Sequence, residues 1–276
     1  MNRAGIWLTL GTTLSMIACG SAGASDGAPT GSGGSTGTNS TTGGAGTVIV
    51  STPDGSLPDG SSWSDAGCSS NNLTGVLRDF LVSPPEFEGP IADDRGLVQT
   101  QLGADGKPVY AGAAGGTATT SGKVKFDQWY NDVANVNMRK PFTIPFQRGS
   151  NGISTYDNQS FFPIDGELFG NENNAHNFHF TFELHTTFVY KNGDTFQFRG
   201  DDDLWLFINK QLVIDLGGVH AAEEQAISLD QLAPTIGLAP GGEYSFDLFY
   251  NERHTGQSEI EIQMTLVFKD CGVVPR

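Results

Sequence analysis

Three consecutive carboxylates, Asp201, Asp202 and Asp203, are the residues whose types and spacing most strongly indicate chemistry. They lie in FRGDDDLWLFINKQLVID, residues 198–215, between two segments with the composition of buried strands. Aspartate is rarely buried without a partner, and three in a row repel one another unless a cation or water compensates them. The stretch therefore predicts either a cation site or a solvated acidic turn.

Calcium is the cation that suits such a cluster, because Ca²⁺ takes six to eight oxygen ligands from carboxylates, carbonyls and water. Neighbouring side chains of an extended strand point to opposite faces, so two adjacent aspartates share an ion only where the backbone turns them together. A cis peptide bond would do so at roughly 3–4 kcal/mol, which ion binding would offset. Arg253 and His254, in YNERHT, offer a metal-free alternative by neutralising the aspartates through charge-assisted hydrogen bonds.

Other candidate residues are expected to be structural. His179, Glu183 and His185 share one face of a strand, but six residues span about 20 Å, so the two histidines cannot hold one metal and a solvated sheet face is expected. His220 follows the glycine pair of DLGGVH, and we favour a role in that turn over contact with a ligand. Four aromatic residues are expected in the core rather than on a binding platform: Trp129, Tyr130, Trp205 and Phe207.

Composition limits the function. The chain has 276 residues and a formal net charge of −16, which excludes a basic surface for nucleic acid and suits a secreted protein that carries divalent cations. None of the common hydrolase, phosphate-binding or zinc motifs is present, so we do not expect an enzyme. Abundant acidic residues alone do not define a glycosidase pair.

The N-terminus predicts export. Residues 1–18 have the layout of a secretory signal, and MIAC at its end resembles a bacterial lipobox with Cys19 as the lipidated residue. An ordinary cleaved signal with an incidental cysteine is the alternative. Residues 19–67 are rich in Gly, Ser and Thr and are expected to form a disordered tether. The predicted domain is residues 68–276.

Two further cysteines, Cys68 and Cys271, flank the strand-like part of the chain. Outside the cytosol such a pair predicts a disulfide that ties the two ends of one domain together. Closing so long a loop would contribute on the order of 4–5 kcal/mol on the loop-entropy model. Two free thiols are the alternative.

The pattern from Leu73 onward predicts an all-β fold, an antiparallel sandwich or barrel with long loops. Residues 191–194, with the Asn-Gly pair, predict a hairpin turn, and Asn209-Lys210 predicts a second tight turn. One helical turn is expected over 126–131. Residues 83–122 and 148–177 are expected to be surface loops that would carry binding specificity. The strands are expected at 178–190, 195–199, 204–208, 212–214, 244–250 and 259–268.

Several motifs in order along residues 73–270 resemble the fibro-slime family, which looks like a branch of the protective-antigen-type (PA-fourteen, PA14) β-sandwich superfamily. The motifs are LTGVLRDF (73–80), FDQWY (126–130), RGDDDLW (199–205), DLGGVH (215–220) and FYNERHT (249–255). The resemblance implies an extracellular module that binds carbohydrate or mediates adhesion.

The resemblance also implies a site. Adjacent aspartates joined by a cis peptide hold Ca²⁺ in the sugar-binding members, and this pair falls on Asp201 and Asp202. Asn251 is the expected third ligand, although the match there is loose, and Asp203 stands where the wider superfamily often has glycine. The predicted ligand-binding set is completed by Asp203, His220, Arg253 and His254.

The sequence therefore predicts a lipid-anchored or secreted bacterial surface protein whose β domain binds a glycan or matrix polysaccharide with Ca²⁺. Its contact with a membrane would be made through the N-terminal lipid alone. A structural matrix protein without a sugar site is the alternative, and a glycan hydrolase is the least favoured.

Overall fold

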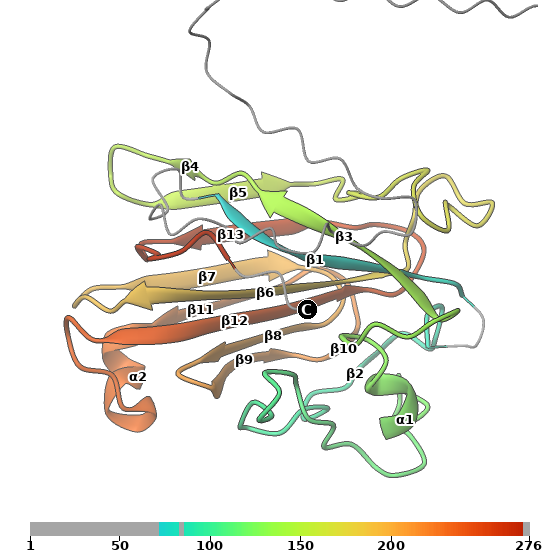
Figure 1. The fold of residues 1–276 in the computed structure, drawn as a ribbon, viewed down its shortest axis with the longest axis horizontal. Coiled ribbons are helices and arrows are strands. Elements are labelled where there is room, and N and C mark those ends of the chain that lie inside the picture. The colour runs from blue at the N-terminus through green and yellow to red at the C-terminus, as the bar shows by residue number, and fades with distance from the viewer. Residues whose placement is uncertain (1–71, 83–85, 273–276) are drawn as a thin grey trace, which may run out of the picture. The chain divides into compact units, whose positions relative to one another are not determined.

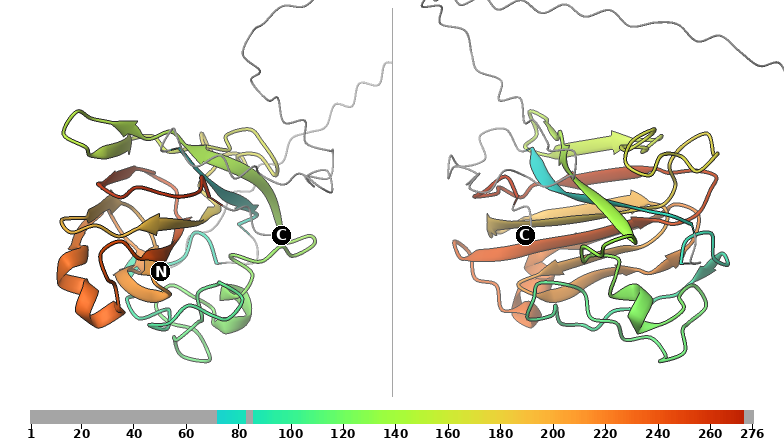
Figure 2. Two further views of the ribbon diagram at one scale, coloured as in Figure 1. Left: turned by 60° about the vertical axis from the view of Figure 1, so that its left-hand side comes forward. Right: turned by 45° about the vertical axis from the view of Figure 1, so that its right-hand side comes forward.

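The computed structural model describes residues 72–82 and 86–272, in which two antiparallel sheets pack face to face (Figures 1 and 2). The predicted signal, Cys19, the tether and Cys68 lie outside the described residues. The first sheet has the order β3-β1-β6-β12-β8-β9, and its strands are Asn137–Ile144, Leu73–Phe80, Phe180–Val189, Glu243–Glu252, Leu204–Ile208 and Gln211–Leu216. The second has the order β11-β7-β13-β5-β4, with strands Glu223–Ser228, Thr195–Gly200, Ile260–Met264, Ser154–Asn158 and Gln147–Arg148. The predicted all-β, antiparallel fold is confirmed.

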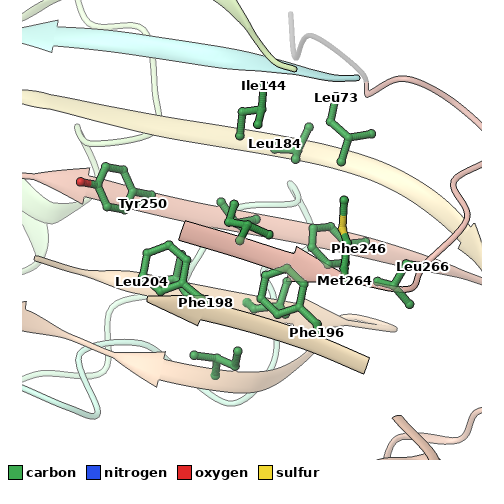
Figure 3. Close-up of a cluster of buried hydrophobic side chains, with 14 of the residues drawn as sticks. Leu73, Ile144, Leu184, Phe196, Phe198, Leu204, Phe246, Tyr250, Met264 and Leu266 are labelled. Atoms are coloured by element: carbon green, nitrogen blue, oxygen red, sulfur yellow. The ribbon is translucent and has the colours of Figure 1, made fainter. Parts of the chain in front are cut away.

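The space between the sheets is filled by aliphatic and aromatic side chains from both of them (Figure 3). Alternation along the strands produces this core, since every second side chain of a strand points to the same face. On β8, Leu204, Leu206 and Ile208 enter the core, while Phe196 and Phe198 of β7 enter it from the opposite sheet. Each of these side chains is essentially inaccessible to solvent, and burying one such residue contributes about 1.5–3 kcal/mol.

The turn after β6 does not form the predicted hairpin. Residues 191–194 do make a turn, in which the backbone N–H of Asp194 donates to the carbonyl of Lys191. However, β6 pairs with β1 and β12, whereas β7 pairs with β11 and β13 of the other sheet. The turn carries the chain across the sandwich because the aromatic faces of β6 and β7 bury each other through the core.

The second predicted tight turn is confirmed. Strands β8 and β9 pair directly, with Ile208 opposite Gln211. Asn209 and Lys210 between them have φ angles of 50° and 61°, the left-handed conformation that a two-residue hairpin requires.

The helices differ from the prediction. Helix α1 covers Lys123–Phe126 and so ends where the helical turn was expected to begin. Helix α2, Leu229–Ile236, was not predicted, because a proline lies inside its eight residues and masks the helical pattern. Neither of these two helices, the only ones in the described part of the chain, has the length and hydropathy of a membrane span.

A second core lies on the outer face of the six-stranded sheet. The four aromatic residues expected to be internal, Trp129, Tyr130, Trp205 and Phe207, are all buried there, as predicted. They are covered by part of the segment expected to be a surface loop, which contributes Leu97, Val98 and Tyr110. The segment 83–122 is therefore in part a covering layer. Its strand β2, Ala92–Asp93, pairs with β10, Gly218–Val219.

This covering layer encloses charged residues as well. The expectation of a solvated face for His179, Glu183 and His185 is wrong, since the first two are nearly or fully buried and His185 is mostly buried. Glu183 accepts hydrogen bonds from Arg78 Nη1 at 2.6 Å and His185 Nε2 at 2.7 Å, and from the ammonium group of Lys107. His185 Nδ1 lies 2.7 Å from Oδ1 of Asp247. The alternation along the strand predicted which side chains share a face, but it did not reveal that a second layer covers that face.

This network of ion pairs around Glu183 shifts the pKa values of both His185 and Glu183. Burial alone would lower the pKa of His185, but hydrogen bonds to Asp247 and Glu183 outweigh it and raise the pKa to about 9. Burial would raise the pKa of Glu183, yet the bond from His185 and the charges of Arg78 and Lys107 lower it to about 2. Both groups are therefore charged at neutral pH.

The raised pKa of His185 predicts a pH-dependent stability. A group with a raised folded-state pKa stabilises the fold fully below its ordinary pKa of 6.5 and loses that contribution as pH rises to about 9. One pKa unit corresponds to about 1.4 kcal/mol, so roughly 3 kcal/mol should be lost across this window. Urea unfolding at several pH values would measure it. In His185→Gln the free energy of unfolding should depend much less on pH across this window. His176→Gln, at a more exposed histidine, is the control and should keep the pH dependence of the wild type. The same pH dependence in His185→Gln and wild type would contradict the assignment.

Candidate functional site

The three aspartates occupy the turn between β7 and β8, at one rim of the sandwich, and all three are at least 94% buried. The preceding Gly200 pairs with both β11 and β13, and a Cβ there would lie 2.6 Å from the carbonyl of Glu259. This close approach lets the backbone N–H of Glu259 donate to Asp201 Oδ1 at 2.9 Å. The acidic turn is therefore not solvated, contrary to one of the two predicted possibilities.

Backbone donors hold the second aspartate. Asp202 Oδ1 accepts from the N–H of His220 at 3.1 Å, and Oδ2 accepts from the N–H of Arg253 at 2.8 Å. His220 thus contributes its backbone here, while its ring nitrogens lie near the carbonyls of Ala221 and Leu216. The structural role favoured for His220 fits these contacts, and its ligand-binding role stays a prediction.

The third aspartate forms a fully buried ion pair with Arg253. Arg253 Nε donates to Asp203 Oδ2 at 2.6 Å and Nη2 to Oδ1 at 3.1 Å, and both side chains are 0% exposed. Asp203 Oδ1 also accepts from the N–H of Gly218 at 2.7 Å. Gly218 has a φ of 135°, and a Cβ would lie 2.4 Å from the carbonyl of Ala92, so only glycine fits.

Arg253 also fastens the covering layer to the sheet. Its Nη1 donates to the carbonyl of Thr119 at 2.7 Å and its Nη2 to the hydroxyl of the same residue at 3.2 Å. The guanidinium lies 4.7 Å from the ring centre of Trp129, and the backbone carbonyl of Arg253 accepts from the N–H of Glu88. The predicted pairing of Arg253 with the aspartates is present, directed at Asp203.

One guanidinium does not neutralise this cluster, because a fourth carboxylate, Glu252, is 1% exposed beside it. Burial raises the pKa of Asp201 to about 7, with repulsion from Asp202 added, and burial raises that of Asp202 to about 6 against the charge of Arg253. Burial and repulsion from Asp202 and Asp201 raise the pKa of Glu252 well above its ordinary value. In the described part of the chain no basic side chain forms a salt bridge with Asp201, Asp202 or Glu252, and their raised pKa values mean that they bind protons more readily than exposed carboxylates do.

Asn251, the predicted third ligand, makes its hydrogen bonds with residues other than Asp201 and Asp202. Asn251 Nδ2 donates to Asp203 Oδ2 at 3.2 Å, and its Oδ1 accepts from the hydroxyl of Tyr130 at 2.5 Å. The structure thus joins Asn251 to the ion pair, and its role as a ligand stays a prediction. Glu252 is the residue that the sequence analysis missed. Its place within the FYNERHT motif, between Asn251 and Arg253, was the available signal.

A second polar group, also missed, holds the β12–β13 loop. Glu88, with a φ of 62°, accepts from the backbone N–H of Thr255 at 2.7 Å and lies 3.0 Å from His179 Nε2. Its other oxygen is 3.8 Å from the ring of His254. His254 is therefore placed beside Glu88, and its predicted role toward a ligand stays open. Glu88 lies in a segment without periodicity, so only the fold reveals this contact.

The donor set partly fits calcium. Carboxylate oxygens of Asp201 and Asp202 have the chemistry that Ca²⁺ prefers, and no basic side chain of the described residues forms a salt bridge with them. In the described part of the chain, however, no group of three or more His, Cys, Asp or Glu side chains is arranged as a metal site. An ion here would need backbone carbonyls and water to complete its shell.

The predicted disulfide stays a prediction, since Cys68 lies outside the described residues. Cys271 follows β13, and its backbone carbonyl accepts from the N–H of Thr74 at 2.6 Å. The end of the domain therefore lies against the start of β1.

Comparison with known proteins supports the class. Residues 149–273 match the PA14 domain family, in agreement with the antiparallel fold and with the superfamily resemblance of the sequence. That stretch contains the three aspartates, Glu252 and Arg253. This part of the chain is thus similar to a PA14 domain, and the narrower fibro-slime assignment stays a prediction.

Proteins with similar sequences are found in Dictyostelium discoideum. The chain is 40% identical to protein psiR over 211 residues, 68% of this chain and 21% of psiR. It is 38% identical to psiD over 217 residues, 72% of this chain and 41% of psiD. The chain thus spans well under half of either relative. These relatives are eukaryotic and lend no support to a bacterial lipoprotein, which stays a prediction.

Two solved PA14 domains match the chain at low similarity. The PA14 domain of the MpAFP antifreeze protein is 8% identical with a TM-score of 0.31, over 74% of this chain and 93% of that chain. The PA14 sugar-binding domain from an RTX adhesin is 12% identical with a TM-score of 0.30, over 71% and 96%. TM-scores this low carry no information about the site.

The buried ion pair predicts a large and asymmetric effect on stability. Arg253→Met should lower the free energy of unfolding by about 3–5 kcal/mol, because it leaves Asp203 charged and unpaired in the interior. Adding Asp203→Asn should recover part of the loss by removing that charge. Denaturant unfolding of both variants would measure this.

Arg199→Met provides the control, since Arg199 pairs with Glu259 in a partly exposed salt bridge and should cost far less. Equal losses for Arg199→Met and Arg253→Met, or no recovery in the double variant, would contradict the role given to the buried pair.

Proposed function

We propose that this domain is an extracellular binding module that takes up a carbohydrate or a matrix polysaccharide with the help of Ca²⁺. One observation carries the proposal: Asp201 and Asp202 are adjacent, buried and oriented by backbone donors, yet no basic side chain of the described residues forms a salt bridge with either carboxylate. A solvated turn has no need of such donors, and a purely structural acidic cluster would be expected to hold more than one cation. The PA14 match and the superfamily resemblance support the glycan as ligand.

In this proposal Asp201 and Asp202 supply the first oxygen ligands, and Glu252 supplies further negative charge close to them. Asn251, Asp203 and Arg253 form the support beneath the site. This arrangement places the ion at the rim, where the loop after β12 begins. An ion at such a rim would coordinate sugar hydroxyls in place of water.

A structural matrix protein is the second candidate, and a specific observation favours it. The Arg253–Asp203 pair already fixes the loop without a metal, as the metal-free hypothesis requires. The remaining carboxylates would then be neutralised by protons, in line with their raised pKa values. Assembly that persists in chelator, without any glycan preference, would support this second candidate.

Calcium should stabilise the full-length chain. An ion present at one hundred times its dissociation constant stabilises the native state by about 2.7 kcal/mol, which raises the melting temperature by several degrees. In Asp201→Asn/Asp202→Asn this response should vanish. Without calcium the double variant should be at least as stable as wild type, because two repelling charges are gone.

The control is Glu167→Gln/Glu243→Gln, which removes the same charge from two half-exposed positions. It should keep the full calcium response. Differential scanning calorimetry with calcium or chelator, followed by a glycan array under both conditions, would test the proposal. A wild type that ignores calcium, or glycan binding that survives chelation unchanged, would refute the calcium-dependent mechanism.

A further inference from the structure

The loop between β5 and β6 carries a partly exposed histidine whose ring is held in one orientation. The imidazole of His176 lies parallel to the ring of Phe162, with ring centres 3.9 Å apart and an angle of 5° between the planes. Phe178 meets these two rings edge-on, with ring centres 5.1 Å and 6.1 Å away. Nδ1 of His176 lies 2.5 Å from Oδ2 of Asp165. The ring is therefore oriented by its neighbours, yet its side chain stays 43% exposed.

The chain that leads into this stacked pair touches the segment that orients Asp201. The backbone N–H of Phe161 donates to the carbonyl of Ser258 at 2.8 Å, and the hydroxyl of Ser258 donates to the carbonyl of Phe161 at 2.8 Å. The next residue, Glu259, donates its backbone N–H to Asp201. Phe162 therefore directly follows a residue that is fixed beside the acidic cluster.

The other end of the loop reaches the same rim of the sandwich. Phe180, the first residue of β6, is paired with Glu252 of β12. His176 precedes Phe180 by four residues, and four residues of chain span at most about 14 Å. The stacked pair and the acidic cluster thus lie within reach of one oligosaccharide.

An exposed aromatic ring beside an open carboxylate suits a neutral pyranose. Aromatic faces carry negative charge and pack well against the polarised C–H groups on the apolar face of a sugar ring. Asp165 faces His176 with Oδ2 and accepts from the backbone N–H of Asn177 with Oδ1 at 2.7 Å. A carboxylate has about four acceptor positions, so this half-exposed group retains capacity for sugar hydroxyls. Its charge would repel an anionic sugar, and a purely apolar ligand would offer it no donor.

We propose that His176 and Phe162 form a stacking subsite for a neutral pyranose of the glycan, with Asp165 as the acceptor for its hydroxyl groups. This subsite deepens the function proposed above and rests on it for the glycan. It assigns part of the specificity to the loop between β5 and β6. Stacking on His176 requires neither Ca²⁺ nor Asp201 and Asp202, so the subsite and the calcium site are separable.

Titration of the full-length chain in chelator, with ¹H–¹³C NMR of the histidine rings, tests the stacking. Methyl β-D-glucopyranoside and methyl β-D-galactopyranoside are the probes, and sorbitol is the control, because it carries similar hydroxyl groups without a ring face. At least one pyranoside should shift the ring resonances of His176, and sorbitol should not. The ring of His185 is the internal control and should stay in place. No shift at His176 with either pyranoside, or an equal shift with sorbitol, would overturn the proposal.

Variants test whether the ring itself makes the contact. Saturation transfer from the protein to the C–H protons of the pyranoside should disappear in His176→Ala and persist in His176→Phe, which keeps a flat ring. Asp165→Asn should weaken pyranoside binding about two- to tenfold, the range expected for one hydrogen bond. Unchanged saturation transfer in a folded His176→Ala would refute the subsite.

The subsite and the calcium mechanism fail separately. Asp201→Asn/Asp202→Asn should contact the pyranoside in chelator as wild type does, and loss of the contact in that variant would place the sugar at the aspartates and refute the subsite. A pyranoside shift at His176 in a protein that ignores calcium would support the subsite while refuting the calcium-dependent mechanism.

Discussion

The buried ion pair between Arg253 and Asp203 is the interaction on which the rim of this sandwich depends. Both side chains are excluded from solvent, so each charge is stable only while its hydrogen-bond partners remain in place. Those partners come from the turn after β7, from Gly218 at the start of β10 and from the covering layer at Thr119. The ion pair thereby ties together three segments that lie far apart in the sequence.

That constraint also creates the acidic site. The guanidinium of Arg253 pairs with Asp203, and Arg253 contacts Asp202 only through its backbone N–H. Asp201, Asp202 and Glu252 are left in the same buried surroundings, where burial raises their pKa values and repulsion from neighbouring carboxylates adds to the rise. In the proposed function, stability and binding are connected at this rim, because the pair that holds the loop leaves these carboxylates for a divalent cation.

The outer layer explains why charged residues are buried on the outer face of the six-stranded sheet. A bare sheet would present Glu183 and His185 to water, but the segment containing Lys107 and Trp129 covers them. Their charges then have to be paired internally, which produces the Arg78–Glu183–His185–Asp247 network. The same layer lines a pocket beside Trp129. It therefore supplies a second hydrophobic core, the residues that cover the ion network and the wall of that pocket.

The sequence by itself determined strands β6 to β9, β12 and β13, the β8–β9 turn and the all-β class, because period-two alternation and the turn residues 209–210 are local properties of the chain. It did not reveal β3, β11 or β5, and β5 lies in a segment that was expected to be a surface loop. It also singled out Asp201, Asp202 and Arg253. Only the tertiary structure decided that β6 and β7 belong to different sheets, that Glu183 is buried, and that Glu252 joins the cluster. Those outcomes depend on which surfaces meet across the sandwich and on a covering layer without periodicity. Local alternation shows that a strand has two faces, but burial on each face is decided by what packs against it.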